Sequence, residues 1–276
     1  MTETETRAHK REFEERGFTV RRGLFSADEV AATIRAIERA RPRDAVPSEL
    51  DKGGLKFKHN IHQMSPELQA FISHEKVVEF LAPIIGPNIW VRWDQGITKV
   101  QGAPEFPWHQ DNGYNRLKEG HFQLWVALSG INGQTGRLWL QPGSHKLGVL
   151  SHSRSGTHQV GPSDAAQPVA VEAESGDAIL FSSLMLHRTD PNISPRPRLV
   201  YVVEYMSLDQ IDPYITPPFF IAARDGRPCR EFVNEQPGMR IAKNRLLYML
   251  PLLGRRFPTL SAAVHGTRAR LRGATR

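Results

Sequence analysis

The feature that most constrains the fold is a series of short β-branched and aromatic runs, which begins just after Gly86. The runs cover residues 89–100, 121–128, 137–140, 178–181 and 199–205. Clusters of turn-forming residues separate them, at 102–104, 130–136, 142–144 and 194–197. Short strands divided by such turns are typical of a β-sandwich or barrel. We therefore expect a strand-rich body from about residue 86 to residue 207.

The residues before Gly86 favour helices instead. The predicted helices cover residues 5–16, 26–40 and 65–85, with a short strand at 17–20 and a loop at 41–54. The second helix has the clearest start, because Ser26 and Glu29 have the spacing of a capping box. Helices followed by many strands predict an α+β protein, in which residues 1–85 give helical support to the strands.

The positive charge of the chain is concentrated at its C-terminal end. The chain carries 36 Lys and Arg against 29 Asp and Glu, a net charge of +7. Residues 236–276 contain nine of the basic residues and no acidic one, which leaves 27 basic against 29 acidic residues before them. Because the body is not basic, we do not expect nucleic acid as a partner. We expect a single domain over residues 1–276, whose basic extension (about 208–276) packs on the sheet or contacts an anionic surface or another subunit.

Two further features bear on the compartment. Cys229 is the single cysteine, so an intrachain disulfide and a cysteine-based zinc or iron–sulfur site are excluded. The first residues lack the apolar core of a signal peptide, and the longest apolar run, 246–253, is interrupted by Pro251. The sequence therefore predicts a cytoplasmic protein without a transmembrane segment.

Two histidines and an aspartate are the candidate metal ligands. His109 and Asp111 are two residues apart, so on a strand they would point to the same face. His187 follows another strand-like run, 176–181, which can bring it to the same pocket. Two histidines and one carboxylate on a β scaffold are typical of iron(II) oxygenases, which keep open positions on the metal. Arg198 begins the next strand, and its guanidinium suits the carboxylate of a 2-oxo acid.

The sequence resembles the phytanoyl-CoA hydroxylase-like branch of the iron- and 2-oxoglutarate-dependent dioxygenases. Three segments carry the resemblance, which extends from about Gly17 to Met206: WHQDNGY at 108–114, TGRLWLQPGSHKLG at 135–148 and GDAILFSSLMLHRTDPNISPRPR at 176–198. It implies a double-stranded β-helix (jelly-roll) core over about 86–207. It also implies Fe(II) bound by His109, Asp111 and His187, with 2-oxoglutarate and O2 as cosubstrates and succinate and CO2 as products. Related halogenases lack the carboxylate ligand, so the presence of Asp111 favours hydroxylation over halogenation, with desaturation, ring formation and oxidative removal of a group as the alternative outcomes.

The resemblance also implies which residues bind the cosubstrate. Arg198 would pair with its distal carboxylate, and four further candidates are Thr189, Trp125, Lys58 and Gln95. For the substrate, the candidates around the mouth of the pocket are Trp93, Trp108, Asn112, Tyr114 and the stretch 207–220. Their mixture of aromatic and polar groups favours a small organic molecule, such as a natural-product intermediate, a lipid or an acyl derivative.

Other functions explain part of the pattern. A zinc-dependent hydrolase uses the same kind of ligands with water in the fourth position, but it has no need of Arg198 or of oxygen. A non-catalytic jelly-roll protein that binds a ligand has little use for a complete triad, and a nucleic-acid demethylase matches only the basic tail. Each residue also has a structural reading: His187 as a core histidine, His109 and Asp111 as a surface pair, and Arg196 in the place of Arg198.

Overall fold

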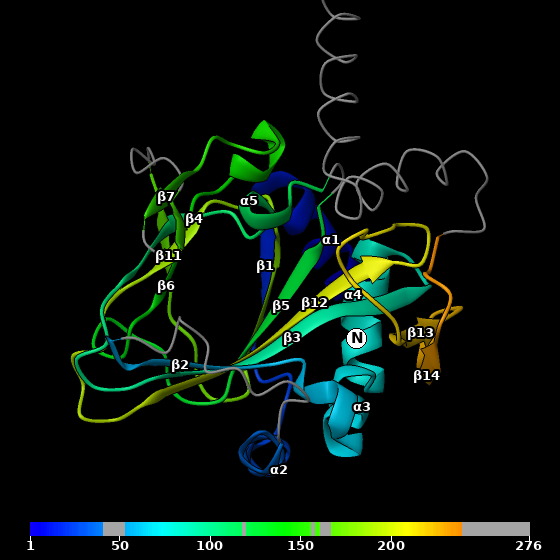
Figure 1. Cartoon of the computed structure of the whole chain (residues 1–276), viewed down its shortest axis with the longest axis horizontal. Helices are drawn as coiled ribbons and strands as arrows, with labels where there is room; N and C mark the ends of the chain where they lie inside the picture. The colour runs from blue at the N-terminus through cyan, green and yellow to red at the C-terminus, as the bar shows by residue number, and fades with distance from the viewer. Residues whose placement is uncertain (41–52, 118–119, 156–157, 161–166, 239–276) are drawn as a thin grey trace, which may run out of the picture.

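Figure 1 shows the computed structural model of the chain, which describes residues 1–40, 53–117, 120–155, 158–160 and 167–238. The loop predicted at 41–54 lies almost entirely outside the described residues. The same is true of most of the basic extension, since residues 239–276 are not described. Within the described ranges, no helix combines the length and the apolarity needed to cross a bilayer.

Two antiparallel sheets form the centre of the molecule. In the part of the chain that is described, the larger sheet has eight strands in the order β1–β10–β5–β12–β3–β13–β14, and β2 also pairs with β3. Their bounds are β1 Phe18–Arg21, β2 Leu55–His59, β3 Ile89–Lys99, β5 Phe122–Ala127, β10 Ala178–Ser182, β12 Arg198–Ser207, β13 Phe219–Arg224 and β14 Arg227–Val233. The smaller sheet has the order β4–β11–β6–β9, with β4 Phe106–His109, β6 Leu138–Leu140, β9 Val169–Val171 and β11 His187–Thr189. A separate hairpin joins β7 Ser153–Ser155 to β8 His158–Val160.

The helices lie mainly on the outer face of the larger sheet, away from the smaller one (Figure 1). They are α1 Glu3–Arg16, α2 Ala27–Arg39, α3 Pro66–Ile72, α4 Glu75–Ile85 and the short α5 Asn112–Asn115, with 3-10 turns at Ile61–Met64 and Ser144–Leu147. The predicted capping box is present, since the Ser26 hydroxyl accepts from Glu29 N and the Glu29 carboxylate accepts from Ser26 N. The single helix predicted at 65–85 is wrong. It is two helices, because His74 is extended and its side chain accepts from Lys76 N to start α4.

Two apolar cores explain why the sheets and helices are layered. Along β12, Tyr201 and Val203 pack with the helices, whereas Val200 and Val202 pack against the smaller sheet. This alternation follows from the two-residue period of a strand that is buried on both faces. The second core lies between the two sheets and also contains Leu138 of β6. The result is the expected α+β fold with a jelly-roll core.

The strands predicted from the sequence correspond to β1, β3, β5, β6, β10 and β12, within two residues at each end. The sheet also continues past the predicted body, because β1 and β2 precede residue 86 and β13 and β14 follow residue 207. β13 pairs with the first residues of β3, while β2 pairs with its last five. The long strand β3 can serve both partners because its eleven residues exceed the length of either.

Candidate metal centre and cosubstrate pocket

The three predicted metal ligands converge between the strands of the smaller sheet. His187 of β11 is the register partner of His109 of β4, and the centroids of the two rings are 4.0 Å apart. Asp111 follows β4, with Oδ1 3.5 Å from His109 Nε2 and Oδ2 3.6 Å from His187 Nε2. Atoms bound to one ion at about 2.1 Å are about 3.0–3.4 Å apart. The three donor atoms, all within 4.8 Å of one another, are therefore close enough to share an ion.

The geometry that we expected for Asp111 was wrong, although the convergence was right. β4 ends at His109, and Asp111 has right-handed helical backbone angles (φ −59°, ψ −36°) at the start of α5. The carboxylate thus reaches the histidines through a turn and not by strand alternation. Gln110 fixes this turn, because its amide donates to Gly148 O and Leu184 O and accepts from Leu150 N.

Each histidine has its Nε2 atom directed to the metal position. His109 Nδ1 donates to Pro107 O at 2.8 Å, and His187 Nδ1 donates to Met185 O at 3.0 Å. A neutral imidazole that donates from Nδ1 keeps the lone pair on Nε2, which is the atom that a metal would take. Burial, and next the neighbouring His109, lower the pKa of His187 to about 4, so His187 is neutral at pH 7.

Asp111 supplies the negative charge of the triad. Burial by itself raises the pKa of this carboxyl, but its contacts with His187 and His109 outweigh burial and lower the pKa well below the usual range. The site therefore presents two imidazole nitrogens and one carboxylate, a donor set that suits Fe(II).

A cavity of about 440 Å³ opens beside the triad between the two sheets. Six of the predicted cosubstrate and substrate residues line it: Trp93, Gln95, Tyr114, Trp125, Thr189 and Arg198. Three others do not. Trp108 is absent from its wall, and Asn112 is buried behind it, where its amide bonds both the N–H and the C=O of Leu117.

Lys58 is the third predicted residue that the structure places elsewhere. Its ammonium donates to the carbonyls of Ile37, Glu38 and Ala40, at the C-terminal end of α2. A cation there satisfies carbonyls that have no partner within the helix and complements the helix dipole. The prediction of Lys58 as a cosubstrate residue is therefore not supported, and a structural role accounts for this side chain.

Arg198 has the properties expected of a carboxylate-binding residue. Its guanidinium is buried and lies over the Trp125 ring, 5.6 Å from the centroid. Nη1 donates to Gly136 O at 3.0 Å, but Nε is buried without a partner, and no carboxylate in the described residues pairs with this cation. Burial lowers the pKa of Arg198 to about 10, so it stays charged at neutral pH. A buried, uncompensated cation with a free donor is what a ligand carboxylate would satisfy.

Lys99, which the sequence reasoning missed, lies beside Arg198 as its register partner on β3. It is fully buried, and its ammonium donates to Thr189 Oγ1 at 3.0 Å and to the carbonyl of Asp190. Burial, and next the charge of Arg198, lower the pKa of Lys99 to about 7. Thr189 is thereby held at the same end of the cavity as Arg198.

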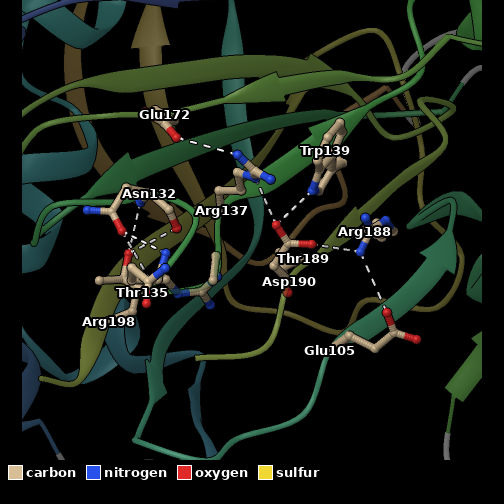
Figure 2. A network of polar contacts seen from close by, with 12 residues as sticks. Glu105, Asn132, Thr135, Arg137, Trp139, Glu172, Arg188, Thr189, Asp190 and Arg198 are labelled. Carbon is tan, nitrogen blue, oxygen red and sulfur yellow. Dashed lines mark hydrogen bonds and ion pairs between the residues drawn. The ribbon is translucent and has the colours of Figure 1, made fainter. Parts of the chain in front are cut away.

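A polar network outside the cavity holds this end of β11 in place (Figure 2). The Asp190 carboxylate accepts from Arg137 Nε, Trp139 Nε1 and Arg188 Nη1, each at 2.8 Å. Arg137 and Arg188 also pair with Glu172 and Glu105, respectively, at 3.6 Å. Because Asp190 follows Thr189 directly, these contacts fix the strand end that faces the cavity.

A second group of buried charges, also missed from the sequence, lies at another part of the cavity wall. Its charged members are Arg92 and Glu204, which line the cavity together with the polar Gln123, and Asp212, which lies behind them with His121. The available signal was a charged or polar residue inside an otherwise apolar strand run, as with Glu204 in LVYVVEYM. Such residues are seldom fully buried unless they are paired.

Comparison with known proteins gives one family match and a consistent set of relatives. The sequence model of the phytanoyl-CoA dioxygenase (PhyH) family matches residues 13–200. An ectoine dioxygenase from Bordetella parapertussis is 24% identical over 228 residues, which cover 71% of this chain and 74% of that protein. A probable alpha-ketoglutarate-dependent hypophosphite dioxygenase from Stutzerimonas stutzeri is 25% identical over 223 residues, 72% of this chain and 78% of that one.

The solved structures agree with the fold. The epimerase SnoN, in complex with Fe3+, alpha ketoglutarate and nogalamycin RO, superposes with a TM-score of 0.65 at 16% identity and covers 84% of this chain and 98% of its own. A non-heme monooxygenase, ThoJ, superposes with a TM-score of 0.67 at 19% identity, over 93% and 99% of the two chains. At such identities the likeness shows the shared architecture alone.

Proposed function

Since the chain belongs to the phytanoyl-CoA dioxygenase family of Fe(II)- and 2-oxoglutarate-dependent oxygenases, we propose that it hydroxylates a small organic molecule at a centre held by His109, Asp111 and His187. The observation that carries this proposal is that the triad and Arg198, whose Nε has no partner, line the same cavity. Iron bound there with 2-oxoglutarate would supply the oxidation, in which O2 gives one oxygen atom to the substrate and one to succinate, with loss of CO2.

The residues of the chain have distinct tasks in this proposal. His109, Asp111 and His187 hold the metal through two Nε2 atoms and a carboxylate. Arg198 binds the distal carboxylate of 2-oxoglutarate, while Thr189 lies beside it and Trp125 and Gln95 border the space between. Because Asp111 occupies the carboxylate position of the triad, we assign hydroxylation and not halogenation.

The cavity itself supports a small-molecule substrate. Its volume of about 440 Å³ falls in the range of roughly 300–1,000 Å³ that is typical of small-molecule sites. Trp93 and Tyr114 on its wall are the remaining substrate candidates. We propose a free small molecule and not nucleic acid as the substrate, and a cytoplasmic place of action.

Arg198 also weighs against a zinc hydrolase with the same ligands. Hydrolysis needs a metal-bound water but no dicarboxylate. In a hydrolase the buried cation of Arg198 on the cavity wall would therefore remain without a counter-charge. The hydrolase and the oxygenase therefore differ in one measurable property, the binding of 2-oxoglutarate.

The test is to add Fe(II) and then 2-oxoglutarate to the apoprotein without oxygen, and to record the weak visible charge-transfer band of the chelate. We expect a band with the wild type, no band when Zn(II) replaces iron, and a band that needs far more 2-oxoglutarate in the Arg198→Ala variant. Admission of O2 should then release succinate. A folded, iron-loaded wild type that shows no band would refute the oxygenase assignment.

A further inference from the structure

Glu204 brings a second charge into the cavity, six residues along β12 from Arg198. At about 3.3 Å per residue the two positions are about 20 Å apart along the strand. Because they are separated by an even number of residues, their side chains face the same side of the sheet. The Glu204 carboxylate accepts from Gln123 Nε2 at 3.1 Å and from Arg92 Nη1, and His121 Nε2 lies 3.3 Å from it. The end of the cavity opposite Arg198 therefore carries a carboxylate, Glu204, together with the guanidinium of Arg92.

The charges at this end do not cancel. Arg92 lies between two carboxylates, because its Nε also donates to Asp212 Oδ2 at 2.5 Å. Burial lowers the pKa of His121 to about 4, so this histidine adds no positive charge at pH 7. One guanidinium thus faces two carboxylates, and one negative charge is left over. Asp212 is completely buried behind the wall, so the excess charge is presented to the cavity by Glu204.

Gln123 adds a hydrogen-bond acceptor that has no donor within the protein. Its side chain is 1% exposed and lines the cavity, and its Oε1 atom is buried without a partner. In this orientation of the amide, Nε2 donates to Glu204 and lies 3.3 Å from His121 Nε2, while Oε1 receives no donor. A buried acceptor without a donor is costly, so the arrangement is complete only when a ligand donates to it.

Aromatic side chains line the same cavity. Trp93 is the register partner of Glu204 on β3, and Tyr114 and Tyr214 also line the cavity. Tyr214 is tied to the charged group, because its N–H donates to Asp212 Oδ1 at 2.8 Å. A carboxylate bordered by aromatic rings is the combination that binds ammonium groups, through charge-assisted hydrogen bonds and cation–π contacts.

We propose that Glu204 and the side-chain oxygen of Gln123 bind a protonated amine of the substrate, so that the substrate class is amine-bearing organic molecules. This inference rests on the proposed function, because it assigns the substrate of the same centre. The charge of the loaded centre is consistent with it. Fe(II), the Asp111 carboxylate, the 2-oxoglutarate dianion and Arg198 sum to zero, and Lys99 beside Arg198 adds no negative charge, so the carboxylate excess around Arg92 remains for a cationic substrate to meet.

The first experiment uses the wild-type protein and three probes with one skeleton: 2-phenylethylamine, 2-phenylethanol and 3-phenylpropionate. The Fe(II) and 2-oxoglutarate complex is formed without oxygen, and the shift of its visible band on addition of each probe gives the dissociation constant. We expect the amine to bind about tenfold or more tightly than the alcohol, and the acid to bind most weakly. Equal or tighter binding of the alcohol or the acid, or no binding of the amine up to its solubility limit, would overturn the proposal.

The second experiment repeats the series with Glu204→Gln, which keeps the size of the side chain and removes its charge. The preference for the amine over the alcohol should fall to about threefold or less, while binding of the alcohol and of 2-oxoglutarate stays within about twofold. Glu231→Gln, at an exposed carboxylate on β14, is the matched control and should keep the full preference. An unchanged preference in Glu204→Gln would overturn the proposal, and if that variant does not fold, the wild-type series decides alone. A band that never forms with 2-oxoglutarate marks the failure of the proposed function instead, and this inference then falls with it.

Discussion

Replacement of Arg198 by methionine should make the empty protein more stable while it abolishes tight cosubstrate binding. Burial lowers the pKa of Arg198 from 12.5 to about 10, so the folded protein holds this proton less tightly than the unfolded chain does. At every pH below about 10 both states carry the charge, and the folded state is destabilised by the full difference, about 3 kcal/mol. Methionine has a similar length and no charge, and it forgoes the hydrogen bond to Gly136 O, worth about 1 kcal/mol.

The net result is a gain of about 1–2 kcal/mol in the free energy of unfolding of the apoprotein. At about 2–4 °C per kcal/mol for a chain of this size, the melting temperature should rise by about 2–8 °C. The same change should weaken 2-oxoglutarate binding strongly. Removal of one partner from a buried, hydrogen-bonded charge pair costs about 2–5 kcal/mol, which corresponds to a dissociation constant roughly 30- to 5,000-fold higher.

Two assays separate these effects. Thermal unfolding of the metal-free protein reports stability, and titration of 2-oxoglutarate against the Fe(II)-loaded protein without oxygen, followed by the visible band, reports affinity. The matched control is Arg196→Met, two residues earlier, whose side chain is exposed and whose carbonyl, which the substitution keeps, bonds the turn before β12. It should leave both quantities near their wild-type values. The reasoning is refuted if Arg198→Met keeps its 2-oxoglutarate affinity within about threefold, or if Arg196→Met loses affinity in its place.

Three further changes test the rest of the centre. Asp111→Ala should weaken Fe(II) binding by on the order of 100-fold or more in an anaerobic iron titration, because a ligand is lost, and undiminished iron binding would contradict its role. Gly136→Ala should destabilise the protein by about 2–3 kcal/mol in urea, since φ is +95° and the new Cβ would lie 2.8 Å from Asp190 O. Gly143→Ala, with φ +81° and no atom within 4 Å, is its control and should cost about 1–2 kcal/mol; equal costs would refute the steric argument. Lys99→Met should remove a pH dependence of the free energy of unfolding. The pKa of Lys99 is lowered to about 7 in the folded state, so between pH 7 and 10.5 only the unfolded chain holds this proton. The free energy of unfolding of the wild type should therefore rise by about 2–3 kcal/mol from pH 7 to 9 relative to the variant. If the free energies of unfolding of the two proteins, measured in urea, change in parallel over this pH range, the pKa of Lys99 is not lowered in the folded state.

The strands that could be predicted from the sequence are those with several apolar residues in succession. β12 is ten residues long and buried on both faces, and seven of its residues are apolar, while the eleven-residue β3 was recognised from the apolar residues that open it, Ile89, Trp90 and Val91. β11 is only three residues long, and its sequence, His187-Arg188-Thr189, carries no apolar side chain. It is a strand because β4 and β6 pair with it on both sides, which is tertiary information.

The residues of the candidate site also fall into those that the sequence could predict and those that it could not. His109, Asp111, His187 and Arg198 belong to chemistry that restricts residue type, so their pattern was visible in the sequence. Lys99 and Glu204 were not, because their meaning depends on what the fold places opposite them. Lys58 shows the converse. Its charge was apparent, but the three carbonyls that bind it come from the end of a helix about twenty residues earlier.

A third histidine, His152, shows why the metal ligands have the tautomer that they need. Its Nδ1 donates to Leu150 O at 2.9 Å, two residues earlier in the chain, as His109 does to Pro107 O and His187 to Met185 O. At His152 the remaining Nε2 lone pair accepts from Gln110 N at 3.0 Å, so the turn between His109 and Asp111 is bonded to it. The same local contact thus leaves Nε2 as an acceptor in all three residues, once for a backbone N–H and twice for the metal position. Because a carbonyl two residues away sets this choice, the chain fixes the ligand atoms before any metal binds, and iron would meet a centre that needs little reorganisation.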